Sequence, residues 1–172
     1  NRNLKLNMPR VQVAVRCRPA LAAEAQITCT KIETNEVNNS VRVQQSDTQD
    51  RVFSFDKVFS EISTQDDVFD FISPMVDHAL DGLHATIFAY GQTGSGKTFT
   101  MEGVSYLQDS VTGKVKPQIE STPVEQHGIT LRAIQSVFDK ANDRMKHNPS
   151  IRYKIKCSFY QIYNERVTDL LN

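Results

Sequence analysis

The stretch that decides the fold is IFAYGQTGSGKTFTMEG, at residues 87–103. Its middle, GQTGSGKT, fits the pattern G-x-x-x-x-G-K-[ST], in which glycines allow positive φ and let backbone N–H groups approach phosphate oxygens closely. Such a loop needs a buried strand before it and a helix after it. The apolar run ATIFAY, at residues 85–90, has the length of that strand, and KTFTM can open a helix. In this context the sequence predicts a nucleotide-binding loop rather than a chance match.

Each member of the loop has a predicted role. Its backbone amides would cradle phosphate oxygens, Lys97 would reach the β- and γ-phosphates, and the Thr98 hydroxyl would coordinate Mg²⁺. GTP-binding proteins with this loop commonly carry an N-K-x-D element for guanine. The sequence has none, so the base must be recognised elsewhere. The predicted phosphate-binding residues are Gly91, Gln92, Thr93, Gly94, Ser95, Gly96, Lys97 and Thr98.

The composition is that of one ordinary globular domain. The 172 residues carry 20 basic and 20 acidic side chains, so no net charge draws the chain to nucleic acid or an anionic membrane, and we expect neither partner. No apolar run approaches the roughly 18 residues that a membrane span needs. Residues 1–10 are predicted to be a flexible basic arm. Cys17, Cys29 and Cys157 lie far apart in strand-like runs, which predicts buried thiols in a reducing, intracellular compartment rather than a disulfide or metal site.

The N-terminal third alternates apolar and polar residues in the manner of β-strands. VQVAVRC predicts a strand at residues 11–17. ITCTKIE and SVRVQQ, at residues 27–33 and 40–45, predict a hairpin. RVFSFDKVF, at residues 51–59, predicts a short strand that runs into a packed turn.

Helical spacing follows these strands. Ser63 and Thr64 precede two aspartates, which predicts a capping box at a helix N-terminus. Apolar residues then recur every three or four positions as far as Leu83. Gly82 is the predicted stop, and Pro74 is predicted to kink the helix or split it.

The remaining segments complete an alternation of strands and helices. Residues 102–127 show no sustained period and are predicted to be a long loop, of the kind that is often either functional or disordered. A second helix pattern runs from residue 129 to about residue 147, and IRYKIKCSFYQIY then predicts a long strand at residues 151–163. This order predicts an α/β layered fold of the P-loop NTPase type, with a central, mostly parallel β-sheet flanked by helices.

Five patches, in the same order along the chain, resemble the kinesin motor domain. FAYGQTGSGKTFTMEG resembles that family's phosphate loop with its flanks, and this match is far more specific than the loop pattern alone. The others are RCRP at residues 16–19, FSFDKVF at residues 53–59, VFDFISPMVDHALDGLHATIFAYGQTG at residues 68–94 and SFYQIYNERVTDLLN at residues 158–172. Within them Gln161 replaces the usual acid, and beside them TLR at residues 130–132 stands where I-P-R is frequent.

The resemblance implies ATP and Mg²⁺ as ligands. It also implies microtubules as the partner of an intact motor that is a microtubule-stimulated ATPase of the cytoplasm and cytoskeleton. Arg16, Arg18 and Pro19 carry over to the adenine pocket, where a guanidinium plane and a proline ring would sandwich the purine between Arg16 and Pro19. Phe99 would lie beside the base, with plain core packing as an equal alternative. One group of residues is better explained by a strand-to-loop corner than by contact with ATP: Tyr160, Tyr163, Asn164 and Glu165.

The larger departure from kinesins is the end of the sequence. Neither the switch I pattern N-x-x-S-S-R-S-H nor the switch II pattern D-x-x-G-x-E of that family occurs. Residues 1–172 are therefore expected to be the N-terminal half of a motor domain, with a fold incomplete at its C-terminal side and little hydrolysis by itself. A truncated, non-hydrolysing binding or structural module is the alternative. A different and complete P-loop NTPase would need a Walker B strand, which the sequence does not offer.

Overall fold

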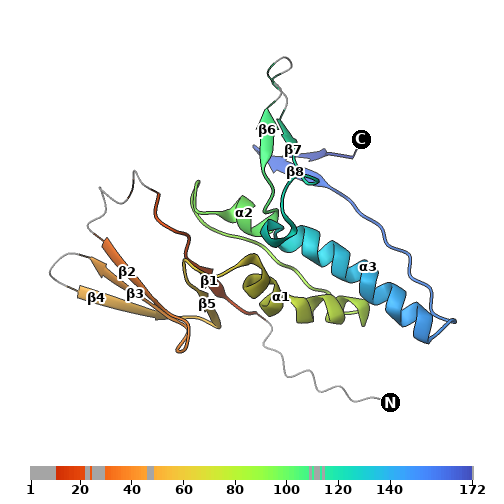
Figure 1. Cartoon of the computed structure of the whole chain (residues 1–172), viewed down its shortest axis with the longest axis horizontal. Coiled ribbons are helices and arrows are strands. Elements are labelled where there is room, and N and C mark those ends of the chain that lie inside the picture. The colour runs from red at the N-terminus through yellow and green to blue at the C-terminus, as the bar shows by residue number, and fades with distance from the viewer. Residues whose placement is uncertain are drawn as a thin grey trace. The chain divides into compact units, whose positions relative to one another are not determined.

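The computed structural model describes residues 11–21, 24, 30–45, 49–108, 110, 113 and 115–171. Helices and strands are both present, as predicted (Figure 1), and they form two compact units, Asn1–Ile134 and Gln135–Asn172. The predicted arm at residues 1–10 and Cys29 lie outside the described residues. Within the described part of the chain, no helix is both long and apolar enough to cross a membrane.

The strands of the first unit form small sheets. β1 (Ala14–Arg16) pairs in parallel with β5 (Lys57–Phe59). A separate antiparallel sheet contains β2 (Thr30–Asn35), β3 (Ser40–Gln45) and β4 (Gln49–Ser54), in that order. The predicted hairpin is therefore confirmed as β2 and β3.

The segment predicted as a short strand that runs into a packed turn, residues 51–59, instead contributes a strand to each of the two sheets. Its backbone hydrogen bonds change partner in the middle: the N–H of Phe55 donates to the Asn39 carbonyl at 2.9 Å, whereas that of Asp56 donates to the Val13 carbonyl at 2.9 Å. The chain thus leaves the antiparallel sheet at β4 and joins β1 as β5.

The first helix, α1 (Gln65–Leu80), begins at the predicted capping box. Thr64 is the N-cap: its hydroxyl oxygen accepts from the Asp67 N–H at 3.2 Å, and the Asp67 carboxylate accepts from the Thr64 N–H at 2.7 Å. The helix continues past Pro74, so the predicted split is wrong. Proline leaves the carbonyl four residues earlier without its N–H partner, and here the Ser73 hydroxyl donates to that Asp70 carbonyl at 3.2 Å.

The core of the first unit lies where α1 meets β5. Phe59, Val68, Ile72 and Ile129 are buried together, and Ile87 and Met101 pack against them. Ile87 precedes the phosphate loop, Met101 ends α2 (Lys97–Met101) directly after it, and Ile129 begins α3 (Ile129–His147). Both flanks of the loop are therefore anchored in one apolar cluster, which positions the loop between them.

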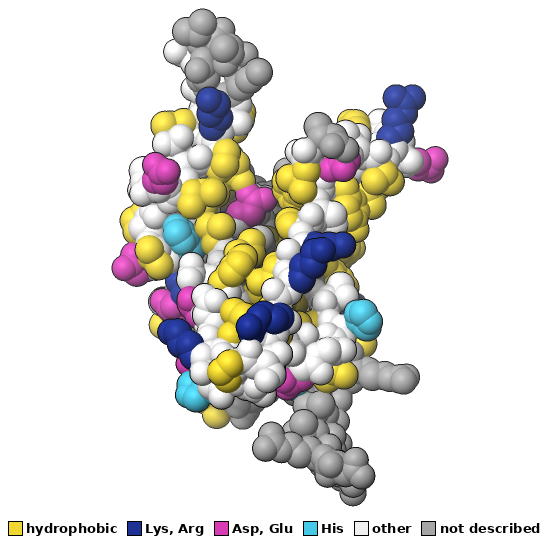
Figure 2. Space-filling view, turned by 90° about the vertical axis from the view of Figure 1, so that its right-hand side faces the viewer, with side chains coloured by type: hydrophobic (Ala, Val, Ile, Leu, Met, Phe, Trp, Pro, Cys, Tyr) yellow, Lys and Arg dark blue, Asp and Glu magenta, His cyan; other side chains and the backbone are white. Residues whose placement is uncertain are grey.

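The strand expected before the phosphate loop is not formed. Residues 85–90 belong to no strand, and among the described residues no strand pairs with them. Ile87 packs into the core, but Phe88 is 81% exposed and Tyr90 is 97% exposed, and hydrophobic side chains reach the surface on the face in Figure 2. The prediction that both faces are covered is wrong, because an extended segment is buried on both sides only when strands and helices flank it.

The predicted central parallel sheet is likewise absent from the described residues. Their sheets are small and separate, and β1–β5 is the one parallel pairing among them. What the structure retains of the prediction is mixed α/β content, with the helices at the predicted positions.

Residues 102–127, predicted to be a long loop, contain secondary structure of their own. β6 (Tyr106–Gln108) pairs with β7 (Val115–Pro117) as an antiparallel hairpin, and a short 3₁₀ helix, η2 (Val124–Gln126), follows. The described part of this segment is therefore a hairpin followed by a turn of 3₁₀ helix, and we call residues 102–127 the excursion.

The second unit ends in a hairpin rather than a long strand. β8 (Tyr160–Tyr163) pairs with β9 (Arg166–Asp169), and Asn164 and Glu165 between them have φ of 47° and 62°, as in a tight two-residue turn. The corner predicted for this patch lies at Asn164 and Glu165, but it joins two strands rather than a strand and a loop. The strand predicted over residues 151–163 is confined to β8, and Cys157 is exposed rather than buried because no sheet forms around it; Cys17, in the first unit, is partly buried.

Candidate functional site

The phosphate-loop candidate is a glycine-dependent turn. Gly94 and Gly96 have φ of +80° and +96°, in the left-handed region that favours glycine. At Gly91 a Cβ atom would lie 2.5 Å from the Ser95 hydroxyl oxygen, so a side chain there collides with the loop itself. The backbone of the loop thus follows a path that side chains at these positions would obstruct.

The loop contains an ammonium and several backbone N–H donors within residues 91–98. Lys97 Nζ donates to the carbonyls of Gly91 at 2.8 Å and Gln92 at 2.7 Å, so the ammonium lies over the loop's own backbone. None of the hydrogen bonds within the described chain uses the N–H of Gly94, Gly96 or Lys97. An ammonium and several backbone amides around one turn are the donor set that phosphate oxygens require, and the exposed Thr98 follows at the start of α2.

Two of the residues predicted for the adenine pocket, Arg16 and Phe99, lie beside each other. The Arg16 guanidinium carbon is 5.2 Å from the centre of the Phe99 ring, and its Nη1 donates to Thr100 Oγ1 at 3.1 Å and to Gln65 Oε1 at 2.8 Å. Burial lowers the pKa of Arg16 from its ordinary value, and the Asp67 charge opposes that shift. The side chain is therefore held in place from several sides.

Arg18 contacts the phosphate loop directly. Its Nε donates to the Gly94 carbonyl at 2.8 Å, while Nη1 and Nη2 donate to the Glu24 carboxylate at 2.7 and 2.5 Å. Hydrogen bonding from Arg18 lowers the pKa of Glu24 to about 2. The Arg18 edge is thus occupied by protein acceptors, one of them the Pro19 carbonyl at 2.9 Å, and Pro19 itself is exposed. Arg18 braces the loop in this structure.

Sequence reasoning missed Glu24 and Gln65, two residues that hold these arginines. Gln65 is 4% exposed and shares one face of α1 with Val68, Ile72 and Val76. A polar residue in register with an apolar stripe was the available signal, since a buried amide must have hydrogen-bond partners. For Glu24 the sequence carries no comparable signal, because its partner lies six residues earlier in an irregular segment.

Sequence reasoning also missed Arg132, which binds the end of the excursion. Arg132 Nε donates to the His127 carbonyl at 2.7 Å, its Nη2 donates to the Val124 carbonyl at 3.2 Å, and its Nη1 pairs with Asp66 of α1. The arginine of the TLR stretch therefore fastens η2 to α1. The available signal was that the arginine of TLR matches the family's I-P-R, whereas the other two residues of the stretch depart from it.

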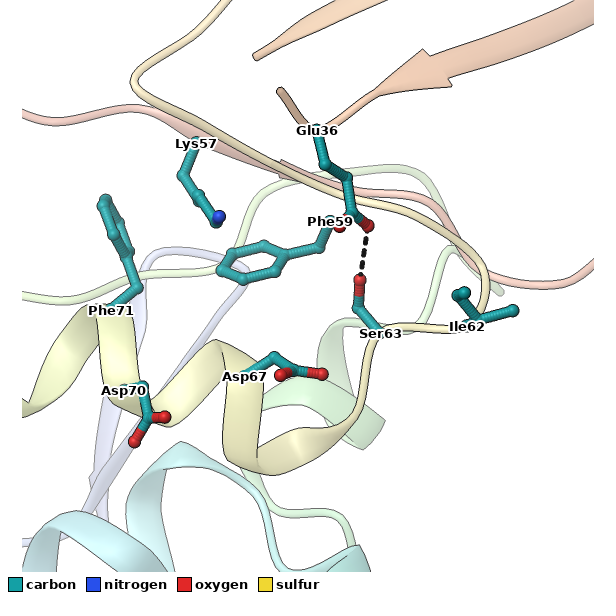
Figure 3. A pocket seen from close by; sticks show the side chains of 8 residues that line it. All are labelled: Glu36, Lys57, Phe59, Ile62, Ser63, Asp67, Asp70 and Phe71. Carbon is teal, nitrogen blue, oxygen red and sulfur yellow. Dashed lines mark hydrogen bonds between the residues drawn. The ribbon is translucent and has the colours of Figure 1, made fainter. Parts of the chain in front are cut away.

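A cavity of about 480 Å³ lies beside the N-terminal half of α1, separate from the phosphate loop (Figure 3). The Glu36 carboxylate points towards Ser63 and accepts from its hydroxyl at 3.0 Å, while hydrogen bonds from Ser60 hold the pKa of Glu36 below its ordinary value. Asp67 is engaged in the helix cap. The cavity contains none of the predicted site residues; it is lined by Glu36, Lys57, Phe59, Ile62, Ser63, Asp67, Asp70 and Phe71.

Comparisons with known proteins match most of the chain to one family. Residues 16–172 match the family model described as "Kinesin motor domain". The chain is 39% identical over 166 residues to "Kinesin-like protein KIN-5C" of Nicotiana tabacum, 40% over 162 residues to "Kinesin-like protein KIF27" of Mus musculus, and 37% over 169 residues to "Protein claret segregational" of Drosophila melanogaster. Each match covers 94% of this chain, but the aligned part is only 15%, 10% and 21% of the respective relative.

Proposed function

We propose, for a chain that belongs to the kinesin motor domain family over residues 16–172, that it forms the ATP-binding, N-terminal half of a kinesin-like microtubule motor. Kinesin motor domains are ATPases, and membership of this family excludes the alternative of an unrelated P-loop NTPase. The chain spans between 10% and 21% of the relatives named above. Movement along microtubules, and a place in the cytoskeleton, are thus proposed for the whole protein.

The observation that carries the proposal is the loop at residues 91–98. Positive φ at its glycines, backbone N–H groups that have no acceptor among the described residues, and the Lys97 ammonium all belong to one turn. We assign phosphate binding to these amides and to Lys97, and Mg²⁺ coordination to the Thr98 hydroxyl. Bound Mg²⁺ would neutralise charge on the phosphate oxygens. The loop residues themselves bind and orient the triphosphate.

The adenine pocket is proposed on the side of the loop where Arg16 meets Phe99. A guanidinium held against an aromatic ring offers a flat surface on which a purine stacks without using its hydrogen-bonding edge. Pro19 is proposed as the opposite wall. Arg18 supports this pocket by holding the Gly94 carbonyl, and the face of its guanidinium rather than its edge is the part left for the base.

The proposal is tested with Lys97→Ala in the full-length protein. Loss of the ammonium removes charge-assisted hydrogen bonds to phosphate, so the dissociation constant for Mg-ATP should rise by about a hundredfold or more. Titration with a fluorescent ATP analogue measures it. Lys154→Ala, at an exposed position of the second unit, is the matched control and should bind as the parent does. Near-normal binding by Lys97→Ala would contradict the assignment.

The alternative, a binding or structural module that does not hydrolyse ATP, is separated by a second measurement on the same protein. ATP turnover in the presence of microtubules that depends on Lys97 supports the motor. Tight ATP binding without turnover supports the module.

A further inference from the structure

Gln65 occupies the point where three segments of the first unit meet. Its side-chain oxygen accepts from Arg16 Nη1 at 2.8 Å, and its side-chain nitrogen donates to the Phe99 carbonyl at 2.7 Å and to the Gln126 carbonyl at 3.0 Å. This orientation of the amide is the one that faces oxygen to a donor and nitrogen to two acceptors. With 4% of the residue exposed, the amide has no water to replace a lost partner.

The three partners come from parts of the chain with different predicted tasks. Arg16 belongs to the proposed adenine wall, Phe99 to the helix directly after the phosphate loop, and Gln126 to η2 at the end of the excursion. Phe99 comes before the excursion and Gln126 at its end, so the Gln65 amide bridges the segments on which the excursion begins and ends. Through Arg16, the same amide also contacts the proposed adenine wall.

Further contacts make this base a close-packed junction. The Gly128 N–H donates to the Glu102 carbonyl at 2.9 Å, and a Cβ atom at Gly103 would lie 2.0 Å from the Gln126 carbonyl oxygen. Arg132 Nη2 also donates to the Val124 and Glu125 carbonyls of η2, at 3.2 and 3.3 Å. A junction packed this tightly does not absorb a displacement locally, so a shift on one side is transmitted to the other.

We propose that Gln65 is a positioning residue that couples the excursion to the nucleotide site, an inference that rests on the proposed ATP binding by residues 91–98. Gln65 touches no nucleotide itself. It sets the place of the Arg16 guanidinium and of the first turn of α2, and it carries changes at either of them to the end of the excursion. Nucleotide binding at the loop therefore stabilises the hydrogen bonds at residues 126–128.

Amide hydrogen exchange in the full-length protein tests this coupling. The N–H groups of Gln126, His127 and Gly128 donate to backbone carbonyls at 2.9, 3.0 and 2.9 Å, so they report on the junction. Saturating Mg-ATP should slow exchange in a peptide covering residues 91–100 and, about fivefold or more, in one covering residues 124–130. In Gln65→Met, which is of similar size but lacks both polar groups, the first protection should persist and the second should be lost.

Two further variants sharpen the result. Gln65→Glu keeps an oxygen towards Arg16 and removes the donors to Phe99 and Gln126, so it too should lose protection at residues 124–130; it stands in should Gln65→Met fail to fold. Gln161→Glu makes the same chemical change at an exposed position of β8 and should behave as the parent.

The outcomes separate the two proposals. Protection of residues 91–100 that does not extend to residues 124–130 in the parent overturns the coupling and leaves ATP binding intact. Protection at both places in Gln65→Met and Gln65→Glu also overturns it, because the junction then needs no side-chain amide. Absence of protection at residues 91–100 in the parent contradicts ATP binding by this loop, and the coupling falls with it.

Discussion

At the scale of single residues, two arginines that leave the same strand end perform different tasks. Arg16 turns into the domain, where Gln65, Thr100 and the Phe99 ring surround it. Arg18 stays near the surface and joins Glu24 to the Gly94 carbonyl. The first arginine is held by neutral partners, of which Gln65 is buried, and the second by a carboxylate, so the second contact depends on the protonation of Glu24.

This difference predicts a pH-dependent contribution of Glu24 to stability. The pKa of Glu24 is about 2 in the folded chain against an ordinary value of 4.5. A lowered folded pKa means that the stabilisation is fully present above pH 4.5 and is lost as the pH falls towards 2. Glu24→Gln should therefore lower the melting temperature near neutral pH, and the difference from the parent should shrink between pH 4.5 and 2. Thermal melts across this range measure it; a pH-independent difference would contradict the ion pair as its cause.

At the scale of elements, the backbone segments that directly follow α2 and η2 are hydrogen-bonded, with the Gly128 N–H donating to the Glu102 carbonyl. Gly103 ends the turn after α2 with φ of +65°, and a Cβ atom there would lie 2.0 Å from the Gln126 carbonyl and 2.5 Å from the Gly128 nitrogen. At Gly128 a Cβ atom would lie 2.6 Å from the Met101 carbonyl carbon. The two glycines are therefore required because two chain segments pass too close for a side chain between them.

A pair of glycine substitutions isolates this packing term. Gly103 and Gly113 have nearly equal φ, +65° and +66°, but around Gly113 a Cβ atom would meet nothing nearer than 4.0 Å. Alanine at either position carries the same conformational strain. Gly103→Ala should cost about 2 kcal/mol more in unfolding free energy than Gly113→Ala, because overpacking adds to strain there. Equal values from denaturant unfolding of the two variants would show that the close approach does not exist in solution.

At the scale of the whole molecule, the surface carries apolar side chains that a strand would ordinarily bury. Residues 87 and 89 face inward and are partly buried, whereas Phe88 and Tyr90 face outward and are almost fully exposed. This alternation is that of an extended segment with one covered face. Residues 85–90 would become a sheet strand only if further strands flanked them.

Chemical labelling of tyrosine checks that expectation. Tyr90 is 97% exposed and Tyr106 is 43% exposed in the structure. In the 172-residue chain expressed alone, tetranitromethane should nitrate Tyr90 at least as fast as Tyr106. In the full-length protein the order should reverse, because a strand within a sheet shields Tyr90. Fast nitration of Tyr90 in both would mean that residues 85–90 do not enter a sheet.

Local features followed from the sequence because their causes lie within a few residues. The capping box at Thr64 and Asp67, the helix stop near Gly82, the hairpin at residues 30–45 and the turn at Asn164 each depend on neighbouring side chains and backbone preferences. The glycines of the phosphate loop belong to the same class. The loop pattern was therefore readable before any contact was known, although binding of ATP by it remains a prediction.

What only the tertiary structure decided depends on partners far away in the chain. Whether residues 85–90 become a strand depends on hydrogen-bond partners that no local pattern supplies, and in this structure they have none among the described residues. The Arg16–Gln65 contact joins residues 49 positions apart, and Gln65–Gln126 spans 61. Sequence alone indicated the family and the phosphate loop, since both depend on short motifs, each made of contiguous residues. The tertiary fold decided which side chains hold that loop in place, because the Gln65 amide is fixed only when it is buried among its hydrogen-bond partners.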